Sequence, residues 1–386
     1  SATDTYNTAV GYRAGLAVTT GVENTLIGGL AGDALTDADY NVAVGKSALS
    51  GDTLGSQSVA IGAFALANQN FTSATNALNT AVGYAAGDAV TTGTRNTLIG
   101  ALAGDAMTVA PNNTALGYDA LGTNTTGGAN VGLGYQALTT MNVTNTSDTF
   151  NTSVGFRAGR LVTGGVQNTL IGARCGDAIT TGGYNTLLGM EAGSYSVNLT
   201  TGSDNVLIGA YSHTSAADTA RAMVLGYNVT GTTDYTTIGN GANDIRAAHG
   251  NTTWATVSDE RYKKDIVDST AGLSFINALQ PRTFKYKTLG ELPETFRAYV
   301  SPDDEEKDST EVFKNSKTNH GFIAQEVKAA IDADSSIKDG FRLWDDRDDG
   351  SQEVAEAALI PILVKAVQEL STALDAALAR ITELEG

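Results

Sequence analysis

A short motif of alternating polar and aliphatic residues recurs along the first 240 residues of the chain. It has the form Asn-Thr-small-aliphatic-Gly and reads NTAVG at 7–11, NTLIG at 24–28 and NVAVG at 41–45. Twelve clear copies are present, and two weaker copies end at Gly226 and Gly239. The alternation predicts a short β-strand in each copy, with one side chain directed inward and its two neighbours outward.

The spacing of these copies predicts how the strands are arranged. The glycines that end the first four copies are 17 residues apart: Gly11, Gly28, Gly45 and Gly62. One rung of this kind cannot bury its aliphatic side chains, but stacked rungs form a continuous narrow core. We therefore predict a β-solenoid or β-roll of 17-residue rungs over residues 1–245, of a handedness that the sequence leaves open. Since large side chains are few, the core is thin, and we expect several chains to associate side by side.

The end of the chain has the periodicity of a helix instead. Apolar residues recur at alternating steps of three and four: Ile360, Leu363, Val367, Leu370, Leu374, Ala377, Ile381 and Leu384. This heptad pattern predicts a helix over 359–385. Two interpretations remain open, namely an amphipathic helix packed on its own domain and a coiled coil between chains. A trimeric array would favour a coiled coil of three chains.

Composition divides the chain in two. Residues 1–257 hold 24 charged residues, whereas the shorter segment 258–386 holds 42, and 38 of the 44 glycines precede residue 258. We expect a repeat domain at 1–245, a linker at 246–257 and a separate α+β domain at 258–386 that ends in the coiled coil.

Charge and residue usage exclude several classes of function. A net charge of −18 argues against a nucleic-acid-binding protein and against electrostatic attachment to anionic lipid. No uninterrupted apolar run approaches about 20 residues, so we expect no membrane insertion. The first residues, SATDTYNTAV, lack the pattern of a signal peptide. With one cysteine and three dispersed histidines, we expect no metal site and no cofactor.

Two further segments are given structural interpretations. Cys175 aligns with Ala31 and Ala103 in the repeat, which indicates a small core position rather than a reactive thiol. The stretch WDDRDDGSQEVAE places acidic residues from Asp345 at calcium-loop spacing. Arg347 stands where an oxygen ligand is needed, so an acidic turn before the helix is the better interpretation.

The repeats SVAIGAFAL at 58–66 and NTAVGYAAG at 79–87 resemble the head repeats of trimeric autotransporter adhesins and similar repeats in phage tail fibres. The likeness covers about residues 5–245, although the 17-residue spacing is longer than is usual in those heads. It implies a trimeric β-roll.

Three stretches of the last domain resemble a second family. VSDERYKKDI at 257–266, HGFIAQEV at 320–327 and LIPILVKAVQEL at 359–370 are similar, in this order, to the intramolecular chaperone domain of phage tail spikes, tail fibres and endosialidases, which is also found in the myelin regulatory factor. The resemblance implies a homotrimeric assembly domain that cuts itself off between Val257 and Ser258. It assigns a Ser-Lys dyad to Ser258 and Lys263, and it makes His320 a further candidate with a less defined role. The acidic insert at about 289–318 departs from the family pattern.

This assignment is chemically reasonable. A serine hydroxyl becomes a nucleophile when a neighbouring base removes its proton, and a lysine acts as that base only where burial or nearby positive charge lowers its pKa. A separation of five residues places two side chains about 140° apart on an α-helix, so a bend or a lysine from another chain is required. An acyl shift onto Ser258 and direct activation of water both remain open.

The sequence thus predicts a trimeric, phage-type tail fibre or spike precursor. It would attach to a cell-surface glycan or protein receptor of the host, be assembled in the host cytoplasm and be carried on the virion, with the chaperone domain released after a single self-cleavage. No activity on other substrates is expected. The alternatives are a non-viral trimeric adhesin, a purely structural shaft and a glycan-cleaving spike, which would require paired carboxylates.

Overall fold

The structure is a computed structural model that describes residues 4–143, 147–251, 253–334, 337 and 343–385. The chain divides into two compact units, the solenoid unit Ser1–Ser258 and the C-terminal unit Asp259–Gly386.

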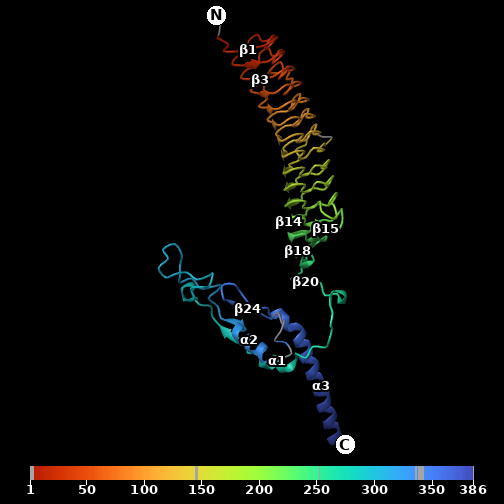
Figure 1. Cartoon of the computed structure of the whole chain (residues 1–386), viewed down its shortest axis with the longest axis vertical. Helices are drawn as coiled ribbons and strands as arrows, with labels where there is room; N and C mark the ends of the chain where they lie inside the picture. Colours follow the sequence, from red (N-terminus) through yellow and green to blue (C-terminus); the bar gives the residue numbers. More distant parts are fainter. Residues whose placement is uncertain (1–3, 144–146, 252, 335–336, 338–342, 386) are drawn as a thin grey trace. The chain divides into compact units, whose positions relative to one another are not determined.

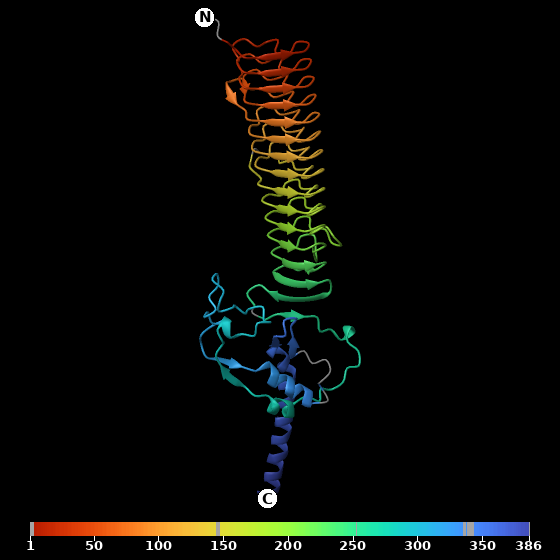
Figure 2. The same ribbon diagram turned by 60° about the vertical axis from the view of Figure 1, so that its left-hand side comes forward.

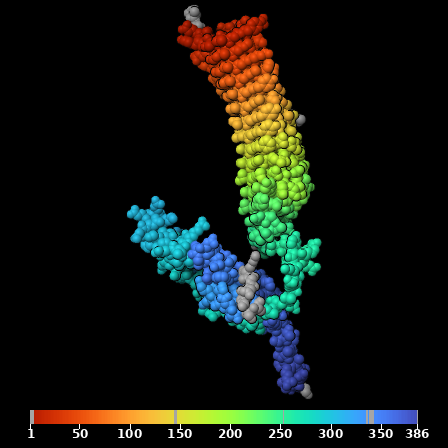
Figure 3. All heavy atoms as spheres, viewed as in Figure 1, coloured from red at the N-terminus to blue at the C-terminus, as the bar shows by residue number. Residues whose placement is uncertain are grey.

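The solenoid unit is a stack of about 14 rungs, each of which contributes one short strand to a single sheet (Figures 1 and 2). The parallel strands are β1 (Thr8–Val10), β2 (Thr25–Ile27), β3 (Val42–Val44), β5 (Val59–Ile61), β7 (Thr80–Val82), β8 (Thr97–Ile99), β9 (Thr114–Leu116), β10 (Val131–Leu133), β11 (Thr152–Val154), β12 (Thr169–Ile171), β13 (Thr186–Leu188), β14 (Val206–Ile208), β16 (Met223–Tyr227) and β18 (Tyr235–Asn240). The space-filling view shows the rungs as successive layers (Figure 3). The predicted β-solenoid of 17-residue rungs is therefore confirmed.

Register in this sheet follows the sequence repeat. Thr8 pairs with Thr25, and Ala9 pairs with Leu26, at the 17-residue spacing of the motif. In the three-residue strands from β2 to β14 the middle residue points into the core, where Leu26, Leu98 and Leu170 are almost fully buried. Because a rung contributes only one or two such side chains, the core is a narrow column that depends on stacking.

Backbone conformation and side-chain hydrogen bonding explain the constant glycine and asparagine of the motif. The glycine that ends each motif copy from Gly11 to Gly226 has a positive φ, and a Cβ on Gly28 would lie 2.5 Å from the carbonyl oxygen of Gly45 in the next rung. The motif asparagines from Asn24 to Asn205 are buried and bond along the stack. The Asn24 side chain accepts the backbone N–H of Asn41 at 3.0 Å and donates to the carbonyl oxygen of Ala38 at 2.7 Å.

The repeat is interrupted where rungs are longer. The rung from Gly62 to Gly83 is longer than 17 residues, and β6 (Thr75–Asn76) in this rung pairs with β4 (Gly55–Ser56) of the rung before it; a second such pair between successive rungs is β15 (His213–Thr214) and β17 (Thr230–Gly231). Ser58 replaces the motif asparagine just before the long rung, and the Gln69 side chain bonds to Ser58 at 3.1 Å and to Asn79 at 2.8 Å. Gln69 thereby fills the gap in the asparagine column.

The solenoid ends in an antiparallel meander. β19 (Asn243–Ala248) pairs with β18, and β20 (Ala255–Thr256) pairs with β19. The segment 246–257, expected as a linker, thus contributes to the sheet. Gly241 has a positive φ and allows the chain to reverse direction before β19, which the repeat pattern could not indicate.

Within the described residues, the C-terminal unit packs three helices and two antiparallel strand pairs around a small core. Its elements are α1 (Leu273–Ala278), β21 (Arg282–Phe284), β22 (Asn319–Gly321), α2 (Ala324–Ala333), β23 (Trp344–Asp346), β24 (Gln352–Val354) and α3 (Ile360–Glu385), with 3₁₀ turns η1 (Glu260–Tyr262), η2 (Leu289–Glu291) and η3 (Glu356–Leu359). Phe275, Val327 and Ile362 belong to the core where α1, α2 and α3 meet. The Glu369 carboxylate on α3 accepts the Leu273 backbone N–H at 2.8 Å, which fixes the start of α1.

The helix α3 buries only its first turns. Ile362 and Ala366 face the core, whereas the heptad residues Leu363, Leu370 and Leu374 are exposed. The heptad stripe is therefore not packed on its own domain within the described residues, and the coiled coil between chains stays a prediction. By length and composition alone the helical stretch Glu356–Glu385 is also apolar enough to cross a bilayer. One such helix is weak support for a membrane span.

Candidate functional site

The bond between Val257 and Ser258 directly follows the last strand of the solenoid sheet. β20 is held on β19 by backbone pairing and by the Thr256 hydroxyl, which donates to the carbonyl oxygen of Asp244 at 3.1 Å. Val257 and Ser258 are exposed. A short ordered strand thus ends where an exposed, irregular segment begins, as a cleavable bond requires.

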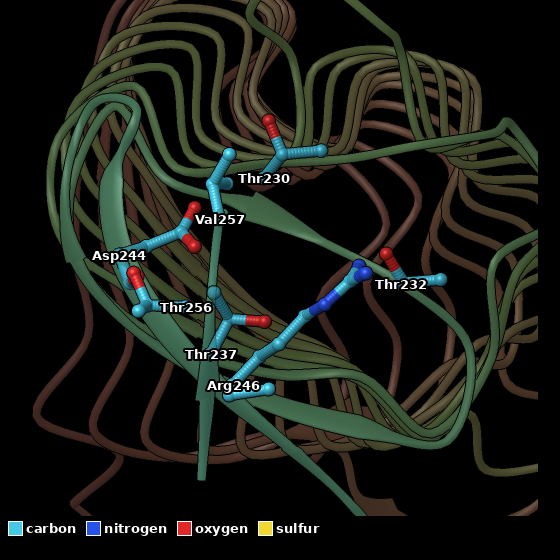
Figure 4. A pocket seen from close by; sticks show the side chains of 8 residues that line it. Thr230, Thr232, Thr237, Asp244, Arg246, Thr256 and Val257 are labelled. Carbon is cyan, nitrogen blue, oxygen red and sulfur yellow. The ribbon is translucent and has the colours of Figure 1, made fainter. Parts of the chain in front are cut away.

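A cavity of about 240 Å³ lies at this end of the solenoid (Figure 4). Its lining includes Thr237, Asp244, Arg246 and Val257. Arg246 pairs with Ala255 across the strands, and its guanidinium lies 5.2 Å from the centre of the Tyr235 ring. The Thr237 hydroxyl is buried without a hydrogen-bond partner in the described part of the chain. The aliphatic core is therefore replaced by polar side chains at the rung next to the proposed cut.

The segment after Ser258 bends instead of continuing as a helix. Asp259 caps η1, and its carboxylate accepts the backbone N–H of Arg261 at 2.9 Å. The Arg261 guanidinium bonds to the same carboxylate, and this hydrogen bond lowers the pKa of Asp259. Lys263, which follows η1, is extended, with φ −118° and ψ 150°. The chain therefore bends between Ser258 and Lys263, as a Ser-Lys dyad at this spacing would need. The guanidinium charge of Arg261 is paired with the Asp259 carboxylate.

Residues 260–270, here called the strap, are exposed along their whole length. The apolar side chains of the strap are exposed as well: Tyr262 is 76% exposed and Val267 is 85% exposed. Several large apolar side chains exposed together are typical of a surface that binds a partner. Within a single chain, Lys263 therefore lacks the desolvated setting that a lysine base needs.

His320 lies elsewhere in the C-terminal unit. It is on β22, paired with Thr283 of β21, and its side chain is exposed. It lines an open groove together with Phe284, Tyr286 and Phe322. Lys263 is not among the residues that line this groove. The structure thus places the two candidate bases in separate surroundings.

Two other sequence interpretations can be compared with the structure. Cys175 is fully buried, and its thiol lies 3.3 Å from the carbonyl oxygen of Leu187. Burial raises its pKa to about 12, so its structural role is confirmed. The acidic stretch from Asp345 forms the hairpin of β23 and β24, where Arg347 bonds to Glu353 at 2.7 Å. The Ser351 hydroxyl, together with the Ser351 and Arg297 backbone N–H groups, lowers the pKa of Asp349 to about 2.

Sequence reasoning missed the polar end of the solenoid and the aromatic groove. Thr237, Asp244 and Arg246 come together through an antiparallel register that follows no repeat. Phe284 and Phe322 meet because β21 and β22 pair across the acidic insert. Neither arrangement leaves a local motif in the sequence.

Comparison with known families identifies part of the C-terminal unit. Residues 258–334 match the family described as chaperone of endosialidase, a family of self-cleaving, peptidase-like chaperone domains. The match begins at Ser258 and includes His320, while the solenoid and α3 lie outside it. No significant match was found among curated proteins or solved structures. This domain and a solenoid of about 14 turns fit a protein of the tail-fibre type.

Proposed function

We propose that the chain is a fibre precursor whose C-terminal unit assembles three copies and then cuts the bond between Val257 and Ser258. One observation carries the proposal. The family match begins at Ser258, and the last strand of the solenoid sheet ends at Thr256. A cut at this bond leaves the entire sheet on the fibre and the entire matched domain on the released piece.

Ser258 is the proposed nucleophile. Its hydroxyl oxygen attacks the carbonyl carbon of Val257 while Lys263 accepts the hydroxyl proton. The peptide bond breaks, the Ser258 nitrogen leaves as an amine after receiving a proton, and an ester joins Val257 to the Ser258 oxygen. Water then hydrolyses this ester, which gives a carboxylate on Val257 and restores the Ser258 hydroxyl. A route in which Lys263 activates water directly gives the same products.

Association of copies is proposed to complete this site. Ser258 and Lys263 are exposed in one chain, and so are the apolar side chains of the strap. If neighbouring copies cover the strap, Lys263 loses water at the same time as Tyr262, Ile266 and Val267 are buried. Cleavage would then follow assembly rather than precede it.

The order of events matters because the solenoid is repetitive. Similar rungs can pair out of register, and non-local β-assembly is slow and exposes unpaired edges. A C-terminal clamp raises the effective concentration of the other chains and sets the register. Removing the clamp afterwards leaves the product kinetically trapped.

Host attachment is the proposed role of the finished fibre, through a glycan or protein receptor and on a virion. The alternative is a non-viral adhesin or a structural shaft that uses the same assembly module. The cleaved solenoid fragment, tested on a glycan array, separates a glycan-binding fibre from a structural shaft, since only the former retains a defined set of glycans.

Intact-mass measurement tests the cleavage itself. The wild-type chain should yield pieces of 257 and 129 residues, and Ser258→Ala should remain whole. Ser274→Ala, at an exposed serine of α1, is the matched control and should cleave as the wild type does. Cleavage of the Ser258→Ala chain, or a cut at a different bond, would contradict the assignment.

A further inference from the structure

The polar cavity at the end of the solenoid unit is lined by side chains whose hydrogen-bonding capacity is unused. The Thr237 side chain is 1% exposed, and its hydroxyl has no hydrogen-bond partner within the described residues. The Asp244 carboxylate and the Arg246 guanidinium likewise form no hydrogen bond or ion pair in the part of the chain that the structure describes. Buried polar groups are normally paired in folded proteins, so this cluster indicates that a further polar group belongs in the cavity.

Strand pairing explains why these three groups meet at one place. The inward column of the sheet continues from Leu207 to Val224 and then to Thr237. Thr237 pairs in turn with Arg246 on the antiparallel strand β19. Alternate residues of a strand share a face, so Asp244 lies on the same face as Arg246. The aliphatic column therefore ends in a hydroxyl, a guanidinium and a carboxylate.

Closing the end of the solenoid does not by itself account for this arrangement. A terminal rung needs a polar outer surface, and water can satisfy the groups on such a surface. Thr237 is enclosed instead, so solvent around the chain does not reach its hydroxyl. In Figure 4 the Arg246 guanidinium is directed toward Thr232, and the Asp244 carboxylate lies on the other side of the cavity. The polar groups thus surround a space of about 240 Å³.

The charges and surfaces of the cavity define the class of molecule that fits it. One acid, Asp244, and one base, Arg246, are among the lining residues, so the lining has no net charge. Ala255 and Val257 add apolar surface. Threonine hydroxyls, which both donate and accept, complete the lining: Thr230, Thr232, Thr237 and Thr256. A small neutral molecule with several hydroxyl groups on an apolar carbon skeleton matches this lining, and a sugar ring has both features.

We propose that this cavity binds one neutral sugar unit. Asp244 accepts hydrogen bonds from sugar hydroxyls, Arg246 donates to sugar oxygens, and the Thr237 hydroxyl pairs with a further sugar hydroxyl. An acidic sugar is disfavoured, because Asp244 repels a second carboxylate in a cavity of this size, and after the proposed cut Val257 carries a carboxylate as well. The link to a host glycan rests on the proposed function, whereas the position of the site does not.

Sugar binding by the full chain tests the site. The probes are glucose, galactose, mannose and N-acetylglucosamine, with glucuronic acid as the acidic counterpart, and calorimetry and saturation-transfer NMR measure binding. We expect at least one neutral sugar to bind both the wild-type and the Ser258→Ala chain, and glucuronic acid to bind more weakly than that sugar. If none of the four neutral sugars binds, or if glucuronic acid binds as tightly as the best of them, the proposal is overturned.

Paired substitutions assign the binding to the cavity. Asp244→Asn should weaken binding about tenfold, as expected for hydrogen bonds to a charged group. Asp218→Asn, at an exposed position outside the cavity lining, is the matched control. Thr237→Val removes the hydroxyl and keeps the shape, so binding should weaken while thermal stability does not fall. Thr236→Val, on the opposite face of the same strand, is its control. Equal binding by the cavity variants and their controls would overturn the assignment.

Intact mass of the same preparations reports cleavage separately from sugar binding. If the wild type stays whole and a neutral sugar binds, the proposed cleavage fails and the site stands. If the wild type is cleaved and no neutral sugar binds, the site fails and the proposed cleavage stands.

Discussion

At the scale of single residues, the motif is determined by close contacts between rungs. Gly28 is required because its neighbour's carbonyl oxygen occupies the space that a Cβ would need. Asparagine is required because one side chain must both accept an N–H and donate to a carbonyl within a buried column. The proposed cleavage residues are different, since Ser258 and Lys263 are exposed in one chain.

Asn168→Ala should destabilise the solenoid. Its side chain donates to the carbonyl oxygen of Gly182 at 2.9 Å and accepts the backbone N–H of Asn185 at 3.1 Å. Each buried group left without a partner costs about 1–3 kcal/mol. Asn198→Ala, at an exposed position, is the control and should change stability little. Thermal unfolding of the cleaved fragment measures the difference, and equal midpoints would contradict a structural role for the column.

Lys263→Ala should abolish cleavage and leave an assembled, folded chain, because its proposed role is chemical. Lys264→Ala is the matched control, since that neighbouring lysine is equally exposed. Intact mass and sedimentation report cleavage and assembly separately. Cleavage of Lys263→Ala at the wild-type rate would transfer the role of base to His320.

At the scale of elements, α3 has two faces with different tasks. Ile362, Ala366 and Glu369 bind the helix to the rest of its unit, the last by fixing the start of α1. The side chains of the heptad stripe, from Ile360 to Leu384, are exposed in the part of the chain that the structure describes. One helix can therefore hold its own domain together and still offer a complete seam to other copies.

Replacing Leu370 and Leu374 with Glu should prevent assembly, and with it cleavage. Both side chains are more than half exposed in the single chain, so the substitutions should leave the fold of the unit intact. The control is Gln368→Glu with Thr372→Glu, which adds the same charge outside the seam. Sedimentation gives the oligomeric state and gel analysis gives the extent of cleavage. A cleaving monomer would show that the site is complete within one chain.

At the scale of the whole molecule, the two units have opposite requirements. The solenoid unit consists of similar rungs that can pair in many registers, whereas the C-terminal unit carries the heptad stripe and the proposed cleavage site. Longer rungs, such as the one that runs from Gly62 to Gly83, interrupt the repeat and so help to distinguish one register from another.

Residues 1–257 expressed alone should misfold or aggregate. The same residues released by cleavage should remain associated and resist heat, because the register has already been set. Sedimentation and thermal unfolding of the two preparations test this prediction. A soluble, correctly assembled product from 1–257 alone would remove the need for a chaperone.

The sequence by itself determined the solenoid, its rung length and the buried position of Cys175. A repeat fixes all of these because each rung meets only its neighbours, so local spacing is enough to define the packing. The tertiary structure decided what depends on distant pairing. The antiparallel strands β19 and β20 turned an expected linker into part of the sheet, and they gathered Thr237, Asp244 and Arg246 beside Val257. The tertiary structure also showed which face of α3 is buried. The sequence could not show this, because a heptad pattern specifies an apolar stripe and not the surface that covers it.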